Sequence, residues 1–181
     1  NELIKMQISA VLKELDPHFT FNAISSIGYL IMQGEKEEAY TYLTRLSSLL
    51  RTILYDGTTI GRALSDELDF VRNYCELQKL RFEGKFTYNI ILAENTEIYR
   101  EVPKMAIQIF VENSLKHGFN GEMKGGVIDI IVSQIDDLME IIVRDNGIGR
   151  AASQKLNTMG TGHGIRTIKR IFEIMNNYNT E

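Results

Sequence analysis

Three short stretches in the second half of the chain combine residue types that could bind a nucleotide and its metal ion. The first is "VENSLKHG", residues 111–118. On a helix, its Asn113, Lys116 and His117 would share one face. There an Asn oxygen can ligate Mg²⁺ and a Lys ammonium can meet a phosphate. The alternative is an ordinary solvated helix end, with Lys116 near the negative end of the helix dipole.

The second stretch is "RDNGIG", residues 144–149, in which Asp145 ends an apolar strand and two glycines follow. Gly147 and Gly149 would let a ligand approach the backbone closely. An ionised Asp only accepts hydrogen bonds, so it suits the exocyclic amine of adenine. By itself, an ordinary Asn-Gly turn explains the stretch equally well.

The third stretch is "GTGHGI", residues 160–165, which leads directly into a helical pattern. Free backbone N–H groups at a helix start attract phosphate. Alone this signal is weak, because the run does not follow a strand directly. It therefore fits neither the Walker A loop nor the Rossmann fingerprint.

The order of these stretches is more specific than any one of them. An Asn-bearing helix, a strand pair, an Asp-Asn-Gly turn, a short loop and a Gly-rich helix start follow one another. This order resembles the N, G1 and G2 boxes of the ATP-binding domain shared by histidine kinases, gyrase and MutL. With "LDPHFTFN" from Leu15 and "LSDELDFVRNYCELQKLRFEGKF" from Leu64, nearly the whole chain resembles the cytoplasmic part of a LytS-like sensor histidine kinase.

The resemblance implies a role for each matching residue. His18 matches the histidine that accepts the γ-phosphoryl group of ATP, Asn113 matches the Mg²⁺ ligand, and Asp145 matches the adenine reader. Lys116 would lie near the phosphates, with His117 in the same site, and residues 150–159 match the lid over the nucleotide. The implied cofactors are ATP and Mg²⁺. The two glycine boxes supply the other nucleotide-binding residues: Gly147, Gly149, Gly160, Thr161, Gly162, His163 and Gly164.

The proline before His18 has a structural explanation. Pro17 either removes a backbone hydrogen bond and kinks a helix, or begins a new helix that Asp16 caps. Either arrangement marks a break at His18 and would expose its ring to the ATP site. Without the ATP boxes, a core histidine beside a helix start would be the simpler interpretation.

Two neighbours of His18 are candidate catalytic residues. Glu14 lies one helical turn before His18, and its carboxylate could orient the imidazole, accept its proton or hold it protonated. Asn22 lies four residues after His18 on the same face. Its amide could orient water against a phosphorylated partner, or bond locally among the helices. Many histidine kinases carry an acid directly after the histidine, whereas this chain has Phe19.

Two other functions share parts of this pattern. An ATP-driven conformational machine of the gyrase or MutL kind places a Glu one turn before the metal-binding Asn, as the base for water. Here Ile109 holds that position and Glu112 would point elsewhere. This favours phosphoryl transfer over hydrolysis. An inactive dimeric scaffold is the other alternative. It is permitted by Phe19 and by Glu14 and Asp16, where the wider family usually has amides.

The elements that carry these residues divide the chain near residue 84. Apolar residues at roughly three-to-four spacing predict helices over residues 3–33, 35–55 and 65–82, with a stop at Gly34 and an N-cap at Ser65. Short loops should pack neighbouring helices antiparallel. Residues 1–84 would thus form a helical module for dimerisation that carries His18.

The second half, residues 85–181, is predicted to be the α/β part of an α+β protein. "KFTYNIIL" predicts a strand, and residues 103–118 predict a helix that begins at Pro103 and ends at Gly118. "GVIDIIVSQI" and "LMEIIVRDN" predict a hairpin around Asp136 and Asp137, and "GIRTIKRIFEIM" predicts a further helix. The resemblance implies a two-layer α/β sandwich of the Bergerat type, whose last strands are expected to be missing after Glu181.

Composition limits the function classes. The 181 residues are 44% hydrophobic, enough for a core, and the net charge of −4 gives no electrostatic reason to expect nucleic acid. The single cysteine, Cys75, excludes an intrachain disulfide and fits a reducing compartment. No signal peptide is visible, and no apolar run approaches the ~20 residues that cross a bilayer. Because the chain starts with Asn1, membrane attachment is expected only through segments outside it.

The resemblance also implies partners and a location. It predicts a homodimer, because the helical module must bury its apolar stripes. It predicts a response regulator with a LytTR-type DNA-binding domain as the protein partner, with no direct contact between this chain and nucleic acid. The expected location is the cytoplasmic part of a bacterial inner-membrane protein.

Overall fold

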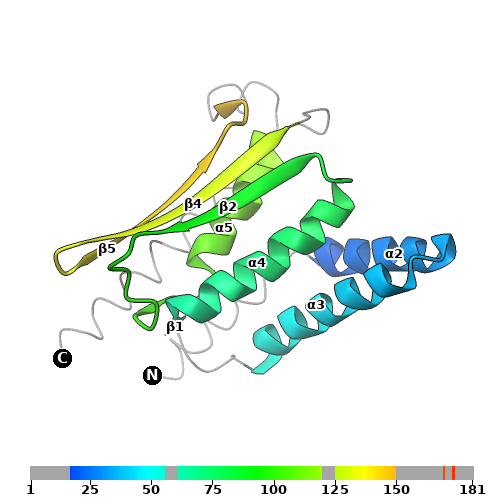
Figure 1. Cartoon of the computed structure of the whole chain (residues 1–181), viewed down its shortest axis with the longest axis horizontal. Coiled ribbons are helices and arrows are strands. Elements are labelled where there is room, and N and C mark those ends of the chain that lie inside the picture. Colours follow the sequence, from blue (N-terminus) through cyan, green and yellow to red (C-terminus); the bar gives the residue numbers. More distant parts are fainter. Residues whose placement is uncertain (1–16, 56–60, 120–124, 150–168, 170–172, 174–181) are drawn as a thin grey trace. The chain divides into compact units, whose positions relative to one another are not determined.

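The computed structural model describes residues 17–55, 61–119, 125–149, 169 and 173 (Figure 1). The chain divides into two compact units. The first consists of residues 1–59 and 69–84, and the second of residues 60–68 and 85–181. One boundary between the units follows residue 84. In addition, residues 60–68 cluster with the later part of the chain rather than with their sequence neighbours.

Helices dominate the described part of the first unit: α2 (Pro17–Gln33), α3 (Lys36–Tyr55) and, from residue 69 onward, α4 (Leu64–Arg81). Gly34 ends α2 in the left-handed conformation at φ 86°, and the N–H of Glu35 donates to the Leu30 carbonyl at 3.0 Å. This is the hydrogen bond of a glycine-terminated helix. The stop predicted at Gly34 is confirmed, whereas the residues before Pro17 lie outside the described ranges, so the choice between kink and new helix stays a prediction.

The core of the first unit joins all three helices. The Phe19 ring of α2 stacks on the Tyr74 ring of α4, with centroids 4.9 Å apart. Arg45 of α3 donates to the Asn73 side chain of α4 at 3.2 Å. The buried apolar residues recur every three or four positions, as an amphipathic helix requires: Phe19, Ala23, Ile27, Leu30, Ala39, Leu46, Leu49, Val71, Tyr74 and Cys75.

Cys75 is a free, buried thiol. Burial raises the pKa of Cys75 to about 12, so the side chain stays protonated at neutral pH and behaves as a small apolar core residue.

The start of α4 belongs to the second unit, where it follows a short strand. Strand β1 (Gly61–Ala63) pairs antiparallel with β3 (Glu101–Pro103). The first N–H groups of α4, those of Leu64 and Ser65, donate to the backbone carbonyls of Arg100 and Ile98 at 2.9 and 2.8 Å. The N-cap predicted at Ser65 is wrong, because α4 already begins at Leu64 and Ser65 lies inside its first turn.

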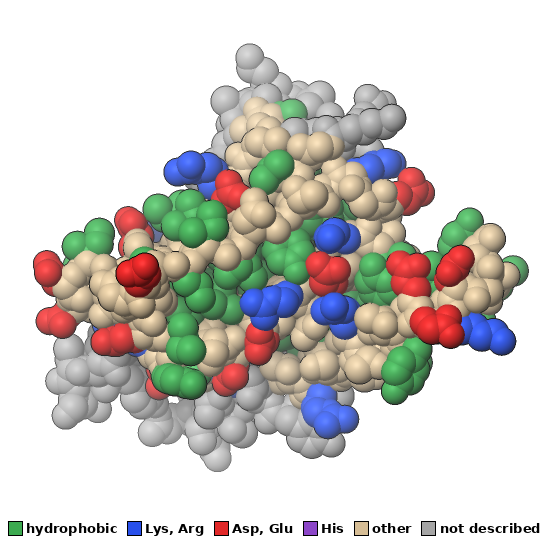
Figure 2. Space-filling model, in the orientation of Figure 1, with side chains coloured by type: hydrophobic (Ala, Val, Ile, Leu, Met, Phe, Trp, Pro, Cys, Tyr) green, Lys and Arg blue, Asp and Glu red, His purple; other side chains and the backbone are tan. Residues whose placement is uncertain are grey.

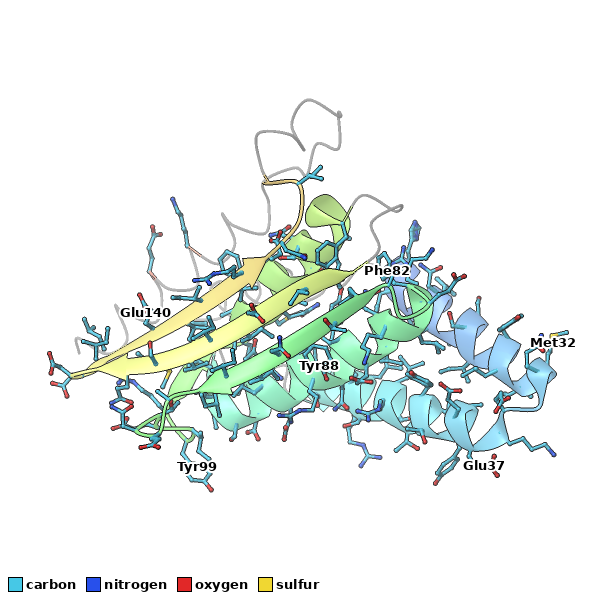
Figure 3. All side chains as sticks on the ribbon, turned by 45° about the horizontal axis from the view of Figure 1, so that its top comes forward. Met32, Glu37, Phe82, Tyr88, Tyr99 and Glu140 are labelled. Atoms are coloured by element: carbon cyan, nitrogen blue, oxygen red, sulfur yellow. The ribbon has the colours of Figure 1, made fainter. Side chains whose placement is uncertain are left out.

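Three strands form the main sheet, in the order β2 (Phe86–Leu92), β4 (Gly126–Ile135), β5 (Leu138–Asp145). β2 runs parallel to β4, and β4 and β5 form an antiparallel hairpin whose turn holds Asp136 at φ 54°. The strand and hairpin predictions are thus confirmed. In Figure 3, Tyr88 of β2 and Glu140 of β5 mark the two strands on either side of β4.

A helical segment connects β3 to β4 and runs behind the sheet in Figure 1. It consists of α5 (Ala106–Asn113) followed by one π-helical turn, η1 (Ser114–Gly118). The predicted end at Gly118 is confirmed. The predicted start at Pro103 is wrong: Pro103 closes β3, Met105 is left-handed at φ 62°, and the helix begins only at Ala106. Proline is tolerated in an edge strand, since it lacks only a donor there.

The described elements confirm the α+β class, with helices and a mixed sheet in one chain. The Bergerat-type sandwich stays a prediction. Most of the helix predicted after residue 164 lies outside the described ranges, although Lys169 and Glu173 within it are helical. Among the helices that the structure describes, none has the length and hydropathy needed to traverse a bilayer.

Candidate functional site

Asp145 ends β5 on the sheet face that α5 covers. It is the register partner of buried Ile128, so both side chains leave the same face. Its Oδ2 accepts a hydrogen bond from Ser114 Oγ at 2.9 Å, and its Oδ1 accepts one from the Gly147 N–H at 2.9 Å. Both carboxylate oxygens are therefore oriented, and each still has a lone pair for a further donor.

Ser114 lies directly after Asn113 and was not identified from the sequence. Its buried hydroxyl lies near two acceptors, the Asp145 carboxylate and the Phe110 carbonyl at 3.1 Å. A hydroxyl has one proton to donate, and the charged, closer acceptor makes the stronger bond. Ser114 thus links the helix that carries Asn113 to the strand that ends at Asp145.

The turn after Asp145 packs directly on the end of η1. A Cβ on Gly147 would lie 2.5 Å from the Gly118 carbonyl oxygen and 2.6 Å from its Cα. The N–H of Ile148 donates to the same carbonyl at 3.1 Å. Glycine is thus required at 147 because two backbones touch there. At Gly149 the requirement is conformational, since its φ is 75°.

Asn146 ties the same turn to the start of β4. Its Oδ1 accepts from the Val127 N–H at 2.7 Å, and its Nδ2 donates to the Gly125 carbonyl at 3.1 Å. The "DNG" triplet therefore divides three tasks. Asp145 offers a carboxylate, Asn146 clamps the turn, and Gly147 permits its contact with the helix end.

Asn113 is the last residue of α5 and is half-buried. Its side chain makes no capping hydrogen bond to the turn that follows. The N–H of Phe119 donates to the Ser114 carbonyl at 3.1 Å, which closes the π-helical turn. π-Helical turns are rare overall, but those that occur are often found at functional sites. The α-helical spacing assumed for Asn113, Lys116 and His117 therefore ends at Asn113.

Lys116 is paired with Glu112 on the preceding turn, with Nζ 2.5 Å from Oε1. The Lys116 side chain is 44% exposed, and an exposed pair of this kind contributes at most about 1 kcal/mol. Lys116 can therefore exchange Glu112 for a phosphate group at little cost in free energy. The side chain of His117 lies outside what the structure describes.

The donor set suits magnesium held mainly through a phosphate-bearing ligand. Among the described residues, no group of three or more His, Cys, Asp or Glu side chains gathers to hold a metal ion. Mg²⁺ commonly takes one or two protein oxygens, with substrate phosphates and water for the rest. An Asn113 oxygen fits that pattern.

His18 lies in the other unit, in the first turn of α2, and its side chain is exposed. The next residue, Phe19, is only 5% exposed because its ring stacks on Tyr74. Successive helical residues are rotated by ~100°, so burying Phe19 turns His18 toward solvent. The position that holds an acid in many histidine kinases is here a core residue. Asn22 follows one turn later and is half-buried.

The structure brings Asp145 and Gly147 into contact with Ser114 and Gly118 in the second unit, and Asn113 directly precedes Ser114 in the chain. The remaining predicted site residues lie outside the described ranges and stay predictions: Glu14, Gly160, Thr161, Gly162, His163 and Gly164.

Comparisons with known proteins find related sequences. Residues 6–86 match the family model described as histidine kinase. The chain is 34% identical over 154 residues to the sensor protein LytS of Staphylococcus epidermidis, and 34% identical over 157 residues to the sensor histidine kinase/phosphatase LytS of Staphylococcus aureus. These alignments cover 85% of this chain but only 26% of each relative.

The family match spans the segment that holds exposed His18 and the helices packed around it, and the relatives extend the similarity into the second unit. The chain is therefore LytS-like: residues 6–86 match the histidine kinase family, and most of its length is similar to LytS sensor kinases.

Proposed function

We propose that this chain is the catalytic part of a two-component sensor kinase, which transfers the γ-phosphoryl group of ATP to His18 and then to an aspartate of a response regulator. The observation that carries the proposal is the fixed Asp145 carboxylate, held by Ser114 and Gly147 beside the helix that ends at Asn113. The exposed imidazole of His18 supplies the acceptor. A response regulator of the LytTR type is the partner that the family resemblance favours.

In this mechanism each described residue has a separate role. Asp145 accepts a hydrogen bond from the adenine amine, and Lys116 exchanges Glu112 for a phosphate oxygen. An Mg²⁺ ion held by Asn113 would neutralise phosphate charge. A ring nitrogen of His18 attacks the γ-phosphorus, the bond to the bridging oxygen breaks, and ADP leaves with that electron pair. Such a transfer needs mainly positioning and charge stabilisation.

Hydrolysis of ATP by the same site is disfavoured by Ile109. This residue lies one helical turn before Asn113 in α5, where an ATPase of the gyrase or MutL kind carries a glutamate base. A half-buried isoleucine can neither accept a proton nor orient water. The site therefore retains parts for binding and transfer but lacks this base.

Exchanging the two polar residues should separate adenine recognition from metal-dependent transfer. Asp145→Asn should weaken ATP and ADP binding alike, by about tenfold to a hundredfold, because the amide group offers fewer acceptors to the adenine amine. Asn113→Ala should slow the Mg²⁺-dependent transfer of labelled γ-phosphate more than it weakens ADP binding in EDTA. Calorimetric titration and label incorporation measure the two effects.

Asp129→Asn is the matched control for these variants. Asp129 lies on the same sheet at a position that alternates with the buried ones, and it accepts a hydrogen bond from Asn89 at 2.8 Å. It should bind nucleotide and incorporate label as the unmodified chain does. If Asp145→Asn and Asp129→Asn behave alike, the nucleotide site has been placed wrongly.

The helical module also exposes a large apolar surface, which we propose is covered by a second copy of the chain. Exposed hydrophobic side chains lie among acidic and basic ones in Figure 2, and Met32 and Glu37 flank the α2–α3 turn in Figure 3. By contrast, one row of α3 is polar, with these residues at helical spacing: Thr41, Thr44, Ser48 and Thr52. The exposed apolar residues are Phe21, Ile24, Tyr29, Ile31, Met32, Tyr40 and Leu43.

Ile24→Glu should convert this dimer into a monomer, because it places an unpaired carboxylate in an apolar contact. Ser48→Glu adds the same charge among the polar residues of α3 and should leave the dimer intact. Sedimentation velocity across a dilution series gives the two dissociation constants. Equal constants would show that the exposed residues of α2 do not form the interface.

A further inference from the structure

A buried carboxylate from one helix caps the helix that carries Asn113. Glu67, in the first turn of α4, is 0% exposed. Its Oε2 accepts a hydrogen bond from the Met105 N–H at 3.1 Å, and its Oε1 accepts one from the Ile107 N–H at 3.2 Å. Its carboxylate also pairs with Arg62 of β1, whose Nε lies 2.8 Å from Oε2.

The start of α5 needs such a cap. Met105 occupies the N-cap position in the left-handed conformation and makes no side-chain capping bond. That backbone conformation is unfavourable for a residue with a Cβ and persists only where its surroundings hold it. Glu67 supplies the acceptors that a local Ser or Asp usually provides, and its charge suits the positive end of the helix dipole.

The charge of Glu67 is compensated by Arg62 and by the backbone N–H groups at the start of α5. Burial raises the pKa of the Glu67 carboxyl, while the Arg62 guanidinium and the N–H groups of Met105, Ile107 and Gln108 lower it. The Arg62 side chain is itself only 7% exposed. A buried pair of this kind contributes little net stability, but removing one partner leaves an uncompensated charge. The role of this ion pair is better explained by the geometry that it imposes.

The capping is reciprocal. Backbone carbonyls of Ile98 and Arg100 receive the first N–H groups of α4, and Glu67 of α4 receives those at the start of α5. The pairing of β1 with β3 holds the two segments side by side. The position of α5 is therefore set by the first turn of α4 rather than by its own sequence.

Helix α5 transmits this position to the site. It has eight residues, Ala106 to Asn113, so Asn113 lies ~12 Å along the axis from the capped end. At the far end, Ser114 bonds to Asp145. A tilt at the start would move the Asn113 amide relative to the Asp145 carboxylate, and displacements of ~1 Å are sufficient to slow a positioned reaction.

We propose that Glu67 is a positioning residue of the nucleotide site, which sets the placement of Asn113 by fixing the start of α5. The inference rests on the proposed kinase function and adds a residue that touches neither nucleotide nor metal. This role differs from that of a merely structural acid, because the effect of Glu67 on phosphoryl transfer must pass through Asn113.

Glu67→Gln is the direct test, since the amide keeps the shape but turns an NH₂ group toward a backbone donor. We expect Mg²⁺-dependent labelling to fall about tenfold, the size of one lost hydrogen bond to a charged group, with ADP affinity in EDTA changed less than twofold. Asp66→Asn is the matched control: Asp66 precedes Glu67 in the same turn but is exposed, and its variant should label normally.

Double-mutant cycles show whether the effect passes through Asn113. In an Asn113→Ala background, Glu67→Gln should reduce labelling less than twofold further. In an Asp145→Asn background, it should still reduce labelling about tenfold, because Glu67 acts on the placement of Asn113 whereas Asp145 acts on adenine binding. Full additivity with Asn113→Ala would overturn the proposal.

Hydrogen exchange tests the cap without nucleotide. Glu67→Gln should speed exchange of the amides in residues 104–113 and leave those of β4 unchanged, whereas general destabilisation would speed both. If Glu67→Gln does not fold, Glu67→Asp replaces it, and failure of both to fold would overturn the proposal. An unmodified chain that takes no label would instead contradict the proposed kinase function, and the exchange result would still decide the role of Glu67.

Discussion

Replacing His18 with alanine is expected to abolish phosphorylation of the chain while leaving ATP binding unchanged. No other side chain should replace its ring nitrogen, because positioning is most of what the transfer requires. The substitution itself should be tolerated, since His18 is exposed and the core contact in this turn is made by Phe19. Incubation with γ-labelled ATP and Mg²⁺, followed by measurement of bound label, gives the result.

The label on the unmodified chain should also be acid-labile and alkali-stable, as phosphohistidine is. Ser25→Ala is the matched control, because Ser25 lies seven residues after His18 on the same helix and is exposed. That variant should take up label at the normal rate. Label that persists at full strength in His18→Ala would place the acceptor elsewhere and contradict the assignment.

Gly147→Ala is expected to have the second largest effect, the loss of most nucleotide binding. The added methyl group would lie 2.5–2.6 Å from the carbonyl oxygen, the carbonyl carbon and the Cα of Gly118. Backbone atoms cannot move aside as a flexible side chain can. Overpacking of this kind costs about 1–3 kcal/mol. Relief of the clash would separate the turn from η1 and break the bond between the Ile148 N–H and the Gly118 carbonyl.

Thermal unfolding and ADP titration together measure this effect. Gly28→Ala is the control, because a Cβ at Gly28 meets nothing within 4 Å and alanine is favoured over glycine inside a helix. It should melt at the same temperature or higher and bind ADP normally. Normal ADP affinity in Gly147→Ala would mean that the contact with Gly118 is unimportant for the site.

The strongest sequence patterns predicted the elements best. Alternation of apolar residues identified β2, and two apolar runs on either side of Asp136 and Asp137 identified the β4–β5 hairpin. The glycine at 34 identified the end of α2. Each of these signals depends on neighbours close in sequence. The parallel pairing of β2 with β4 was not predicted, since it joins residues about forty positions apart. Strands β1 and β3 have three residues each, too few to show a period.

The start of α5 was misplaced for a related reason. Pro103 is a good first helical residue by local criteria, but the cap is provided by Glu67, some forty residues earlier. The same limit applies to Ser114, whose role depends on Asp145 in another strand. Asp145 and Gly147 stand out in the sequence because their residue types and spacing suit nucleotide binding, whereas the residues that orient them carry no such signal.

The division of α4 between the two units restricts how such a chain can be recombined. Residues 60–68 supply β1 and Glu67 to the second unit, while the rest of the same helix supplies Val71, Tyr74 and Cys75 to the first. A crossover that joined foreign helices to residue 85 would inherit the sheet but lose the strand that pairs with β3 and the acid that caps α5. The helices of the first unit and the sheet of the second unit are thus expected to be inherited together.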